Sequence, residues 1–139
     1  MLRYPNIKIS IDFDSTLSRR DVQIKVKSWV DLGIDVCVVT SRFSTEEGNK
    51  KGWWWIEKNN KELYDVASIC GIPEEKIVFT HMCDKIDFLK DKGFLFHLDD
   101  DDVELLNILD SSDLCVPVNV NYFEWGEICD KLIKEKINV

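Results

Sequence analysis

Residues 9–17 read Ile9-Ser10-Ile11-Asp12-Phe13-Asp14-Ser15-Thr16-Leu17, a short apolar strand pattern that leads directly into two carboxylates. Side chains two positions apart on a strand point to the same side, and Asp12 and Asp14 can diverge where the strand ends. Thr16 and Leu17 indicate a tight turn after the strand. Open α/β sheets bind their ligands at the carboxyl ends of their strands, so we expect both acids to lie at a ligand-binding edge. Two carboxylates so close together favour the binding of a cation.

Length and composition predict one domain that spans residues 1–139. With 139 residues and 45% hydrophobic content, the chain can bury a single core. A net charge of −8 argues against a general nucleic-acid-coating surface, because phosphate affinity comes mostly from lysine and arginine, but it allows a local basic pocket. No segment is apolar enough to span a membrane, so we expect a soluble, cytoplasmic protein without membrane contacts.

The cysteines predict buried thiols rather than metal ligands. The chain has five cysteines, which are widely spaced without a C-x-x-C pair, and it has two histidines. A zinc site needs a closer cluster of such ligands, so reduced thiols in the core are the better interpretation.

The rest of the chain alternates strand and helix patterns. Strands are expected at 7–11, 34–40, 77–80, 94–98 and 114–120, and helices at 21–32, 60–70, 85–92, 105–109 and 125–136. The segment 41–52 reads as a polar loop. Val36-Cys37-Val38-Val39 is apolar on successive residues, as in a strand covered on both faces. The pattern predicts a three-layer, Rossmann-like α/β domain with a mainly parallel five-stranded sheet.

Polar side chains follow most of these strands. The carboxyl ends of parallel strands share one edge, so residues far apart in sequence are expected to converge there. The converging groups are Asp12, Asp14, Thr40, Ser41, Arg42, Lys85, Asp99 and Asp100. Three carboxylates can hold Mg²⁺, which prefers oxygen ligands, and Lys85 and Arg42 can neutralise a phosphate.

Four ordered pieces of the chain resemble the haloacid dehalogenase (HAD) superfamily of phosphotransferases. The pieces are Asp12-Phe13-Asp14-Ser15-Thr16-Leu17, Val38-Val39-Thr40-Ser41-Arg42, Lys85 and His97-Leu98-Asp99-Asp100. The resemblance covers the whole chain. It implies an Mg²⁺-dependent phosphomonoester hydrolase that works through an aspartyl-phosphate.

The resemblance also implies a role for each matching residue. Asp12 is similar to the nucleophile, and Asp14 to the general acid that later activates water. Thr40 and Lys85 are expected to hold the phosphoryl group as catalytic residues, and Thr16, Ser41 and Arg42 to bind substrate. Asp12, the backbone carbonyl of Asp14 and Asp100 are expected to bind Mg²⁺, with Asp99 as a further ligand or a support of one. Four successive aspartates leave the choice between Asp99 and Asp100 open.

Two residues depart from the family pattern. Ser15 stands where many members have glycine, a change that is tolerated if the backbone there is not at positive φ. His97 interrupts an otherwise apolar strand. With no partner visible in the sequence, His81 and His97 are interpreted as structural or surface residues.

The spacing leaves no room for a cap domain. Residues 17–21 are too few, and residues 41–77 accommodate a loop and one or two helices. Members without a cap act on large substrates or are capped by another subunit, and this chain is similar to cap-less polynucleotide 3'-phosphatases and deoxyribonucleotidases. The expected substrate is therefore a phosphorylated small molecule, a nucleotide or a nucleic-acid end.

Trp53, Trp54 and Trp55 cannot all enter the core. Successive residues turn by 100° on a helix and alternate on a strand, so at least one ring should face solvent, the cleft or another chain. Next to lysines, such a ring can stack on a nucleobase or can form a homo-oligomer contact.

Two alternatives use the same residues without turnover. A receiver domain also has an acidic pair, a threonine and a lysine, but its phosphorylated aspartate ends the third strand, where this chain has Thr80. A catalytically silent HAD-like module that binds phosphate or Mg²⁺ is the other alternative. The presence of Asp14 argues against it, because that acid serves product release.

Overall fold

The five strands form a single parallel sheet, as the sequence predicts. The computed structural model describes residues 6–137. The strands are β1 (Lys8–Ile11), β2 (Asp35–Thr40), β3 (Ile77–Phe79), β4 (Phe96–Asp99) and β5 (Val116–Asn119). Their order is β3-β2-β1-β4-β5, and every neighbouring pair is parallel. The order reverses between β1 and β4, and the carboxyl edge at such a switch point is where doubly wound sheets bind ligands.

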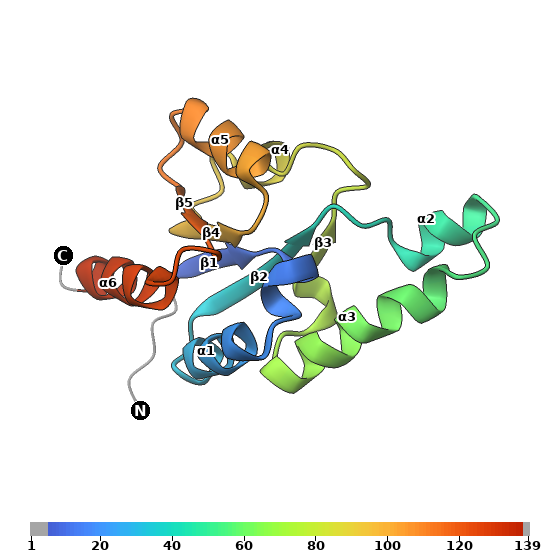
Figure 1. Cartoon of the computed structure of the whole chain (residues 1–139), viewed down its shortest axis with the longest axis horizontal. Coiled ribbons are helices and arrows are strands. Elements are labelled where there is room, and N and C mark those ends of the chain that lie inside the picture. The colour runs from blue at the N-terminus through green and yellow to red at the C-terminus, as the bar shows by residue number, and fades with distance from the viewer. Residues whose placement is uncertain (1–5, 138–139) are drawn as a thin grey trace.

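Helices cover both faces of this sheet (Figure 1). They are α1 (Arg20–Asp31), α2 (Thr45–Lys50), α3 (Ile56–Cys70), α4 (Ile86–Leu89), α5 (Asp102–Asp110) and α6 (Trp125–Ile137). Buried side chains of α1, α3 and α6 pack with Val36 and Val38 of β2, whereas those of α4 and α5 pack with Cys37 and Val39. Because successive strand residues point to opposite faces, this apolar run needs a cover on each side. The predicted three-layer α/β fold is confirmed.

None of the helices within residues 6–137 combines the length and the apolar character that crossing a bilayer requires.

The segment 41–52 contains a helix, so its prediction as a loop was wrong. The side chain of Ser44 accepts a hydrogen bond from the backbone N–H of Glu47 at 3.1 Å and caps α2. Glu46 and Glu47 lie in the first turn, where negative charge is favourable. Ser44 followed three residues later by Glu47 is the sequence pattern of a helix start. The polar composition of residues 41–52 had suggested a loop.

Gly48 allows α2 to pack closely on the start of α3. A Cβ atom at this position would lie 2.4 Å from Cγ1 of the buried Ile56. We predict that Gly48→Ala lowers the free energy of unfolding by about 1–3 kcal/mol, because overpacking forces the two helices apart. Urea unfolding followed by circular dichroism measures this. Gly126→Ala is the matched control, since a Cβ there meets no atom closer than 3.7 Å. Equal losses in the two variants would contradict the packing argument.

The cysteines are all free thiols and differ in exposure. Cys37, Cys70, Cys115 and Cys129 are buried, and burial raises the pKa of each of these thiols. Cys83 is exposed. The prediction of buried thiols is therefore confirmed for four cysteines and wrong for Cys83.

Candidate functional site

Side chains from four segments of the chain lie at the carboxyl edge of the sheet. Asp12 follows β1, Thr40 ends β2, Lys85 precedes α4 and Asp99 ends β4. All four are buried, with at most 4% of their surface exposed. Polar groups are buried to this extent only when partners satisfy them. The fold therefore brings four of the residues singled out from the sequence to one buried edge.

Lys85 bridges two buried carboxylates. Its Nζ donates to Oδ1 of Asp12 at 2.8 Å and to Oδ2 of Asp99 at 2.7 Å. Burial alone would lower the pKa of Lys85, but the two carboxylates raise it, so the ammonium stays charged. Burial, and then the charge of Asp99, raise the pKa of Asp12 to about 8, although Lys85 acts in the opposite direction. One lysine thus does not fully offset the combined effect of burial and of the Asp99 charge on Asp12.

Asp99 uses its carboxylate oxygens to orient its neighbours. Oδ1 accepts the backbone N–H groups of Asp100 and Asp101 at 2.8 and 3.0 Å, and Oδ2 lies 2.7 Å from both Lys85 Nζ and His97 Nε2. Burial alone would raise the pKa of Asp99, but His97 and Lys85 hold it well below its usual range. A carboxylate offers about four acceptor sites, so these four donors take up most of the capacity of Asp99.

His97 has two buried partners that the sequence did not reveal. Its Nδ1 lies 2.7 Å from Oγ of Ser10, and its Nε2 lies 2.7 Å from Asp99. Burial lowers the pKa of His97. A neutral ring that donates from Nε2 to Asp99 and accepts the Ser10 hydroxyl proton at Nδ1 satisfies every group. His97 is thus a structural residue, as predicted, and it supports Asp99.

Asp12, Asp99 and Asp100 form a carboxylate cluster that can hold a metal ion. One oxygen of each lies within 4.8 Å of the others. Hard cations such as Mg²⁺ bind carboxylate oxygens of this kind. A side-chain hydrogen bond with the neighbouring Asp100 also raises the pKa of Asp12, because it favours the protonated form of the Asp12 carboxyl. Asp100 is half-buried, so its carboxylate is more open to a cation than that of Asp99.

Asp14 lies at the rim of the site, paired with Arg42. Nε and Nη2 of Arg42 donate to the two Asp14 oxygens at 2.9 and 2.7 Å. The Asp14 side chain is 55% exposed, whereas that of Arg42 is 13% exposed and also donates to the carbonyl of Asn59 at 2.7 Å. The hydrogen bond with Asp14 raises the pKa of Arg42. The Asp14 carboxylate lies outside the carboxylate cluster, so its expected role at a metal rests on its backbone carbonyl.

The hydroxyl residues differ in their placement. Thr16 is buried, and its hydroxyl lies 3.5 Å from Oδ2 of Asp12, so it faces that carboxylate. The Thr40 oxygen accepts the backbone N–H of Arg42 at 3.2 Å, which leaves its proton available to a ligand. Ser41 is half-buried at the start of the loop after β2.

Ser15 adopts a left-handed conformation with φ of 59°. The substitution for glycine was expected to be tolerated only without a positive φ, and this condition is not met. The left-handed region costs a residue with a side chain about 1–2 kcal/mol. The Ser15 backbone N–H donates to Oγ of Ser18 at 3.1 Å within the same turn. The strained turn leaves Asp14 exposed and Thr16 buried.

Glu104 belongs to this region, and sequence analysis missed it. Its Oε2 accepts the backbone N–H of Lys85 at 2.8 Å and so joins the first turn of α5 to the residue before α4. Burial raises the pKa of Glu104. A glutamate in the first turn of a helix after an acidic run gives no sign of a contact with a lysine 19 positions earlier.

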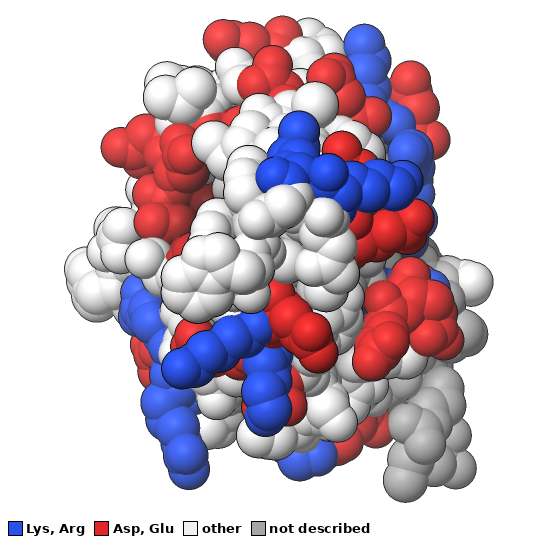
Figure 2. All heavy atoms as spheres, turned by 90° about the vertical axis from the view of Figure 1, so that its right-hand side faces the viewer, with Lys and Arg blue, Asp and Glu red and all other residues white. Residues whose placement is uncertain are grey.

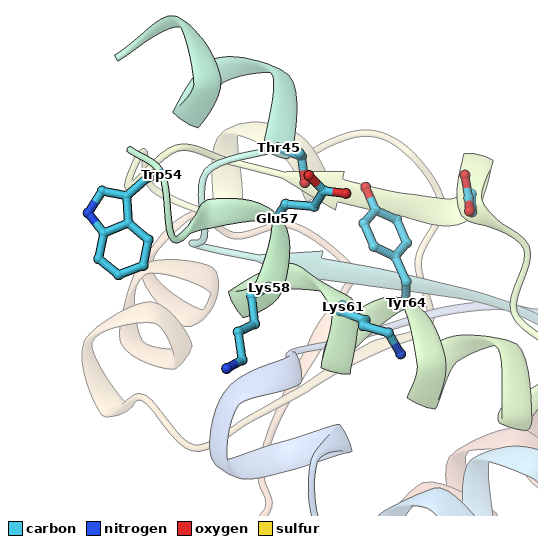
Figure 3. Close-up of a pocket in the computed structure, with 7 residues that line it drawn as sticks. Thr45, Trp54, Glu57, Lys58, Lys61 and Tyr64 are labelled. Atoms are coloured by element: carbon cyan, nitrogen blue, oxygen red, sulfur yellow. The ribbon is translucent and has the colours of Figure 1, made fainter. Parts of the chain in front are cut away.

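A groove of about 750 Å³ lies along α3 (Figure 3), and its lining does not include the carboxylates of the cluster. Its lining residues are Thr45, Trp54, Glu57, Lys58, Lys61, Tyr64 and Glu74. Trp54 is 90% exposed and Trp55 is 41% exposed. At least one tryptophan ring of the triplet therefore faces outward, as predicted.

Comparisons of the chain with protein-family models, with curated proteins and with solved structures gave no significant match. The chemistry of the site is therefore inferred from its own geometry.

Proposed function

We propose that this chain is a cation-dependent phosphomonoester hydrolase of the HAD type, with Asp12 as its nucleophile. The observation that supports this most strongly is the buried Lys85 ammonium, 2.8 Å from Asp12 and 2.7 Å from Asp99 at the switch point of the sheet. A fixed cation at this depth stabilises a phosphoryl group beside the carboxylate that attacks it. The substrate is a phosphorylated small molecule or a nucleic-acid end.

The proposed reaction has two displacements at phosphorus. A carboxylate oxygen of Asp12 bonds to phosphorus while the bond to the leaving alkoxide breaks, and protonated Asp14 gives its proton to that alkoxide. Asp14 then takes a proton from water as the water oxygen bonds to phosphorus. The bond between phosphorus and Asp12 breaks, which releases phosphate and restores the carboxylate. Lys85 and Thr40 donate hydrogen bonds to the phosphoryl oxygens throughout.

Asp12 and Asp100 are the side chains that best fit a divalent cation, together with the backbone carbonyl of Asp14. When bound, such an ion would offset the repulsion between the Asp12 carboxylate and an anionic substrate. An all-oxygen ligand set favours Mg²⁺. Asp99 keeps Lys85 directed at Asp12 instead of binding the ion.

Arg42 has to change partner for Asp14 to act as an acid. The Arg42 guanidinium occupies both carboxylate oxygens of Asp14 and so keeps them from the leaving group of a substrate. A phosphate offers the same two-oxygen geometry, so substrate can compete for Arg42 and free Asp14.

A second candidate is a silent module that binds phosphate and a cation without turnover. The pairing of Asp14 with both nitrogen donors of Arg42 favours it, because this pairing occupies the group needed as an acid. The two candidates differ in a single measurable property, the release of phosphate.

A phosphate-release assay tests the proposed function. The purified protein is incubated with Mg²⁺, or with EDTA, and with nucleotides, sugar phosphates and oligonucleotides that carry a 3'- or 5'-phosphate. We expect Mg²⁺-dependent release from at least one class. Binding of Mg²⁺ and phosphate by calorimetry without any release would support the silent module instead.

Asp100 and Asp101 offer a matched pair for testing the metal site. We predict that Asp100→Asn weakens Mg²⁺ binding at least about tenfold, because it removes a charged oxygen ligand. Asp101→Asn should leave Mg²⁺ affinity unchanged, because Asp101 caps α5 by accepting the backbone N–H groups of Val103 and Glu104, and asparagine caps helices equally well. Titration calorimetry of both variants gives the two affinities. Equal affinities would mean that the acidic run is a solvated turn.

A further inference from the structure

An aromatic cluster adjoins the candidate site on the side of α2 and α3. Trp53 stacks on Trp55, with ring centroids 5.3 Å apart and planes at 14°, and meets Phe43 edge-on at 5.1 Å. Phe43 in turn stacks on His81 at 5.1 Å. The neighbouring Trp54 is left out of this cluster and is 90% exposed.

The cluster is fixed directly to the residues that surround the phosphate site. Phe43 follows Arg42, whose guanidinium holds Asp14. The backbone N–H groups of His81 and Met82 donate to the carbonyls of Arg42 and Ser41 at 3.2 and 2.9 Å, which ties the loop after β3 to the loop after β2. Phe43 and His81 therefore lie on the same pair of joined loops as Ser41 and Arg42, while the tryptophans lie between α2 and α3.

Two loop residues carry backbone strain. His81 and Met82 have φ of 53° and 66°, in the left-handed region that residues with side chains rarely adopt. Strain of this kind is retained where the surrounding structure requires that conformation, and it clusters at functional sites. His81 is also the residue whose ring lies nearly parallel to that of Phe43, with 10° between the planes.

The segment that carries these rings is less acidic than the chain as a whole. Residues 42–65 have five lysines and arginines against five aspartates and glutamates, whereas the whole chain has 18 against 26. Lys61 pairs with Asp65 at 2.6 Å, whereas Lys58 has no such partner among the ion pairs of the described residues. Nζ of Lys51 lies 5.5 Å from the Phe43 centroid and 5.7 Å from that of Trp53. Figure 2 shows this side of the molecule, where an area of uncharged atoms lies among groups of lysine and arginine side chains and groups of acidic side chains. In Figure 3, Trp54, Lys58 and Lys61 project from α3 and the turn before it, and Glu57 of α3 lines the same groove.

We infer that this surface binds single-stranded nucleic acid, with Trp54 stacking on a base while the phosphorylated end lies at Asp12. The inference rests on the proposed function for the position of that end. Stacking on aromatic rings and phosphate contacts with lysines are the two means by which proteins bind single strands without reading their sequence. The net charge of −8 disfavours a second copy of this chain and a nucleic acid alike, so the choice of a nucleic acid rests on the exposed Trp54 ring and on the lysines beside it in the groove.

The test measures binding without turnover. The Asp12→Asn protein serves as the parent, so that the phosphate remains on the probe, and fluorescence anisotropy follows a labelled octathymidylate with a 3'-phosphate, a 5'-phosphate or no phosphate. Adding Trp54→Ala should raise the Kd about tenfold, within the range seen when a stacking ring is removed. The control is Phe123→Ala, which removes an aromatic ring that is 82% exposed in the loop after β5. It should leave the Kd unchanged.

Two further measurements separate the possible outcomes. Lys58→Glu should also weaken binding, and the affinity of the parent should fall as salt rises, because lysine contacts to phosphate release counterions. On the active protein, Trp54→Ala should raise KM for the phosphorylated oligonucleotide and change the rate on p-nitrophenyl phosphate less than twofold.

Several results would overturn the inference while leaving the proposed function intact. They are an absence of oligonucleotide binding, an equal Kd with and without Trp54, and a dimer in light scattering that Trp54→Ala dissociates. Conversely, binding that depends on Trp54 in a protein without phosphatase activity would support the nucleic-acid surface and contradict the proposed reaction.

Discussion

The Asp12→Asn protein should fold normally and lose Mg²⁺-dependent phosphatase activity by at least about 10⁴-fold, a loss typical for removal of a nucleophile. Asparagine has nearly the volume of aspartate, so the buried position remains filled. Its amide oxygen can still accept the hydrogen bond that Lys85 donates at 2.8 Å. The substitution therefore removes the attacking carboxylate and little else. Phosphate release at saturating substrate measures the effect, and circular dichroism verifies the fold.

The Asp110→Asn variant is a suitable control, because Asp110 is an exposed aspartate at the end of α5 and should retain the wild-type rate. A wild-type rate in Asp12→Asn would show that Asp12 is not the nucleophile. Asp14→Asn provides a second comparison. It should slow release of the covalent phosphate and allow ³²P from the substrate to accumulate on the protein, which Asp12→Asn cannot do.

Lys85→Met should be damaging in two separate ways. The apolar side chain has a similar length but leaves Asp12 and Asp99 without the shared ammonium. Breaking a buried ion pair in this way costs about 3–5 kcal/mol of unfolding free energy. Loss of a preorganised electrostatic donor also lowers the catalytic rate by at least about 10²-fold. Urea unfolding and phosphate release measure the two effects independently.

Lys85→Arg separates charge from position. Arginine keeps the positive charge, so most of the stability should return, but its planar fork does not reproduce a single ammonium placed between two carboxylates, so the rate should stay low. Lys90→Met is the control for loss of a lysine, since Lys90 is exposed at the end of α4. A Lys85→Met protein with wild-type stability and rate would contradict the proposed role of this ion pair.

The fold was predictable because its signals are local. Four apolar residues in succession at 36–39 indicate a strand covered on both faces, and the observed core divides them between the two faces. The alternation of strands and helices then fixes the parallel sheet. The helix Thr45–Lys50 was missed because polar composition was given more weight than the capping pattern at Ser44 and Glu47.

The candidate site was predictable in part. The topology brings strand ends together, so the sequence could identify Asp12, Thr40, Lys85 and Asp99 as neighbours. It could not show which hydrogen bonds those groups form. The contact of His97 with Ser10 joins residues 87 positions apart, and the pairing of Arg42 with Asp14 joins residues 28 positions apart. The difference between Asp99 and Asp100 likewise depends on backbone donors that only the folded chain presents.

The cysteines differ in burial, and this difference allows one of them to be labelled selectively. In the folded protein, Cys83 is the exposed thiol, two positions before Lys85, while the other four are enclosed and have raised pKa values. A maleimide dye should therefore attach at one position, close enough to the carboxyl edge of the sheet to report ligand binding there. The remaining four thiols become reactive only when the core opens. Counting labelled thiols over time would then measure how often the molecule unfolds under native conditions.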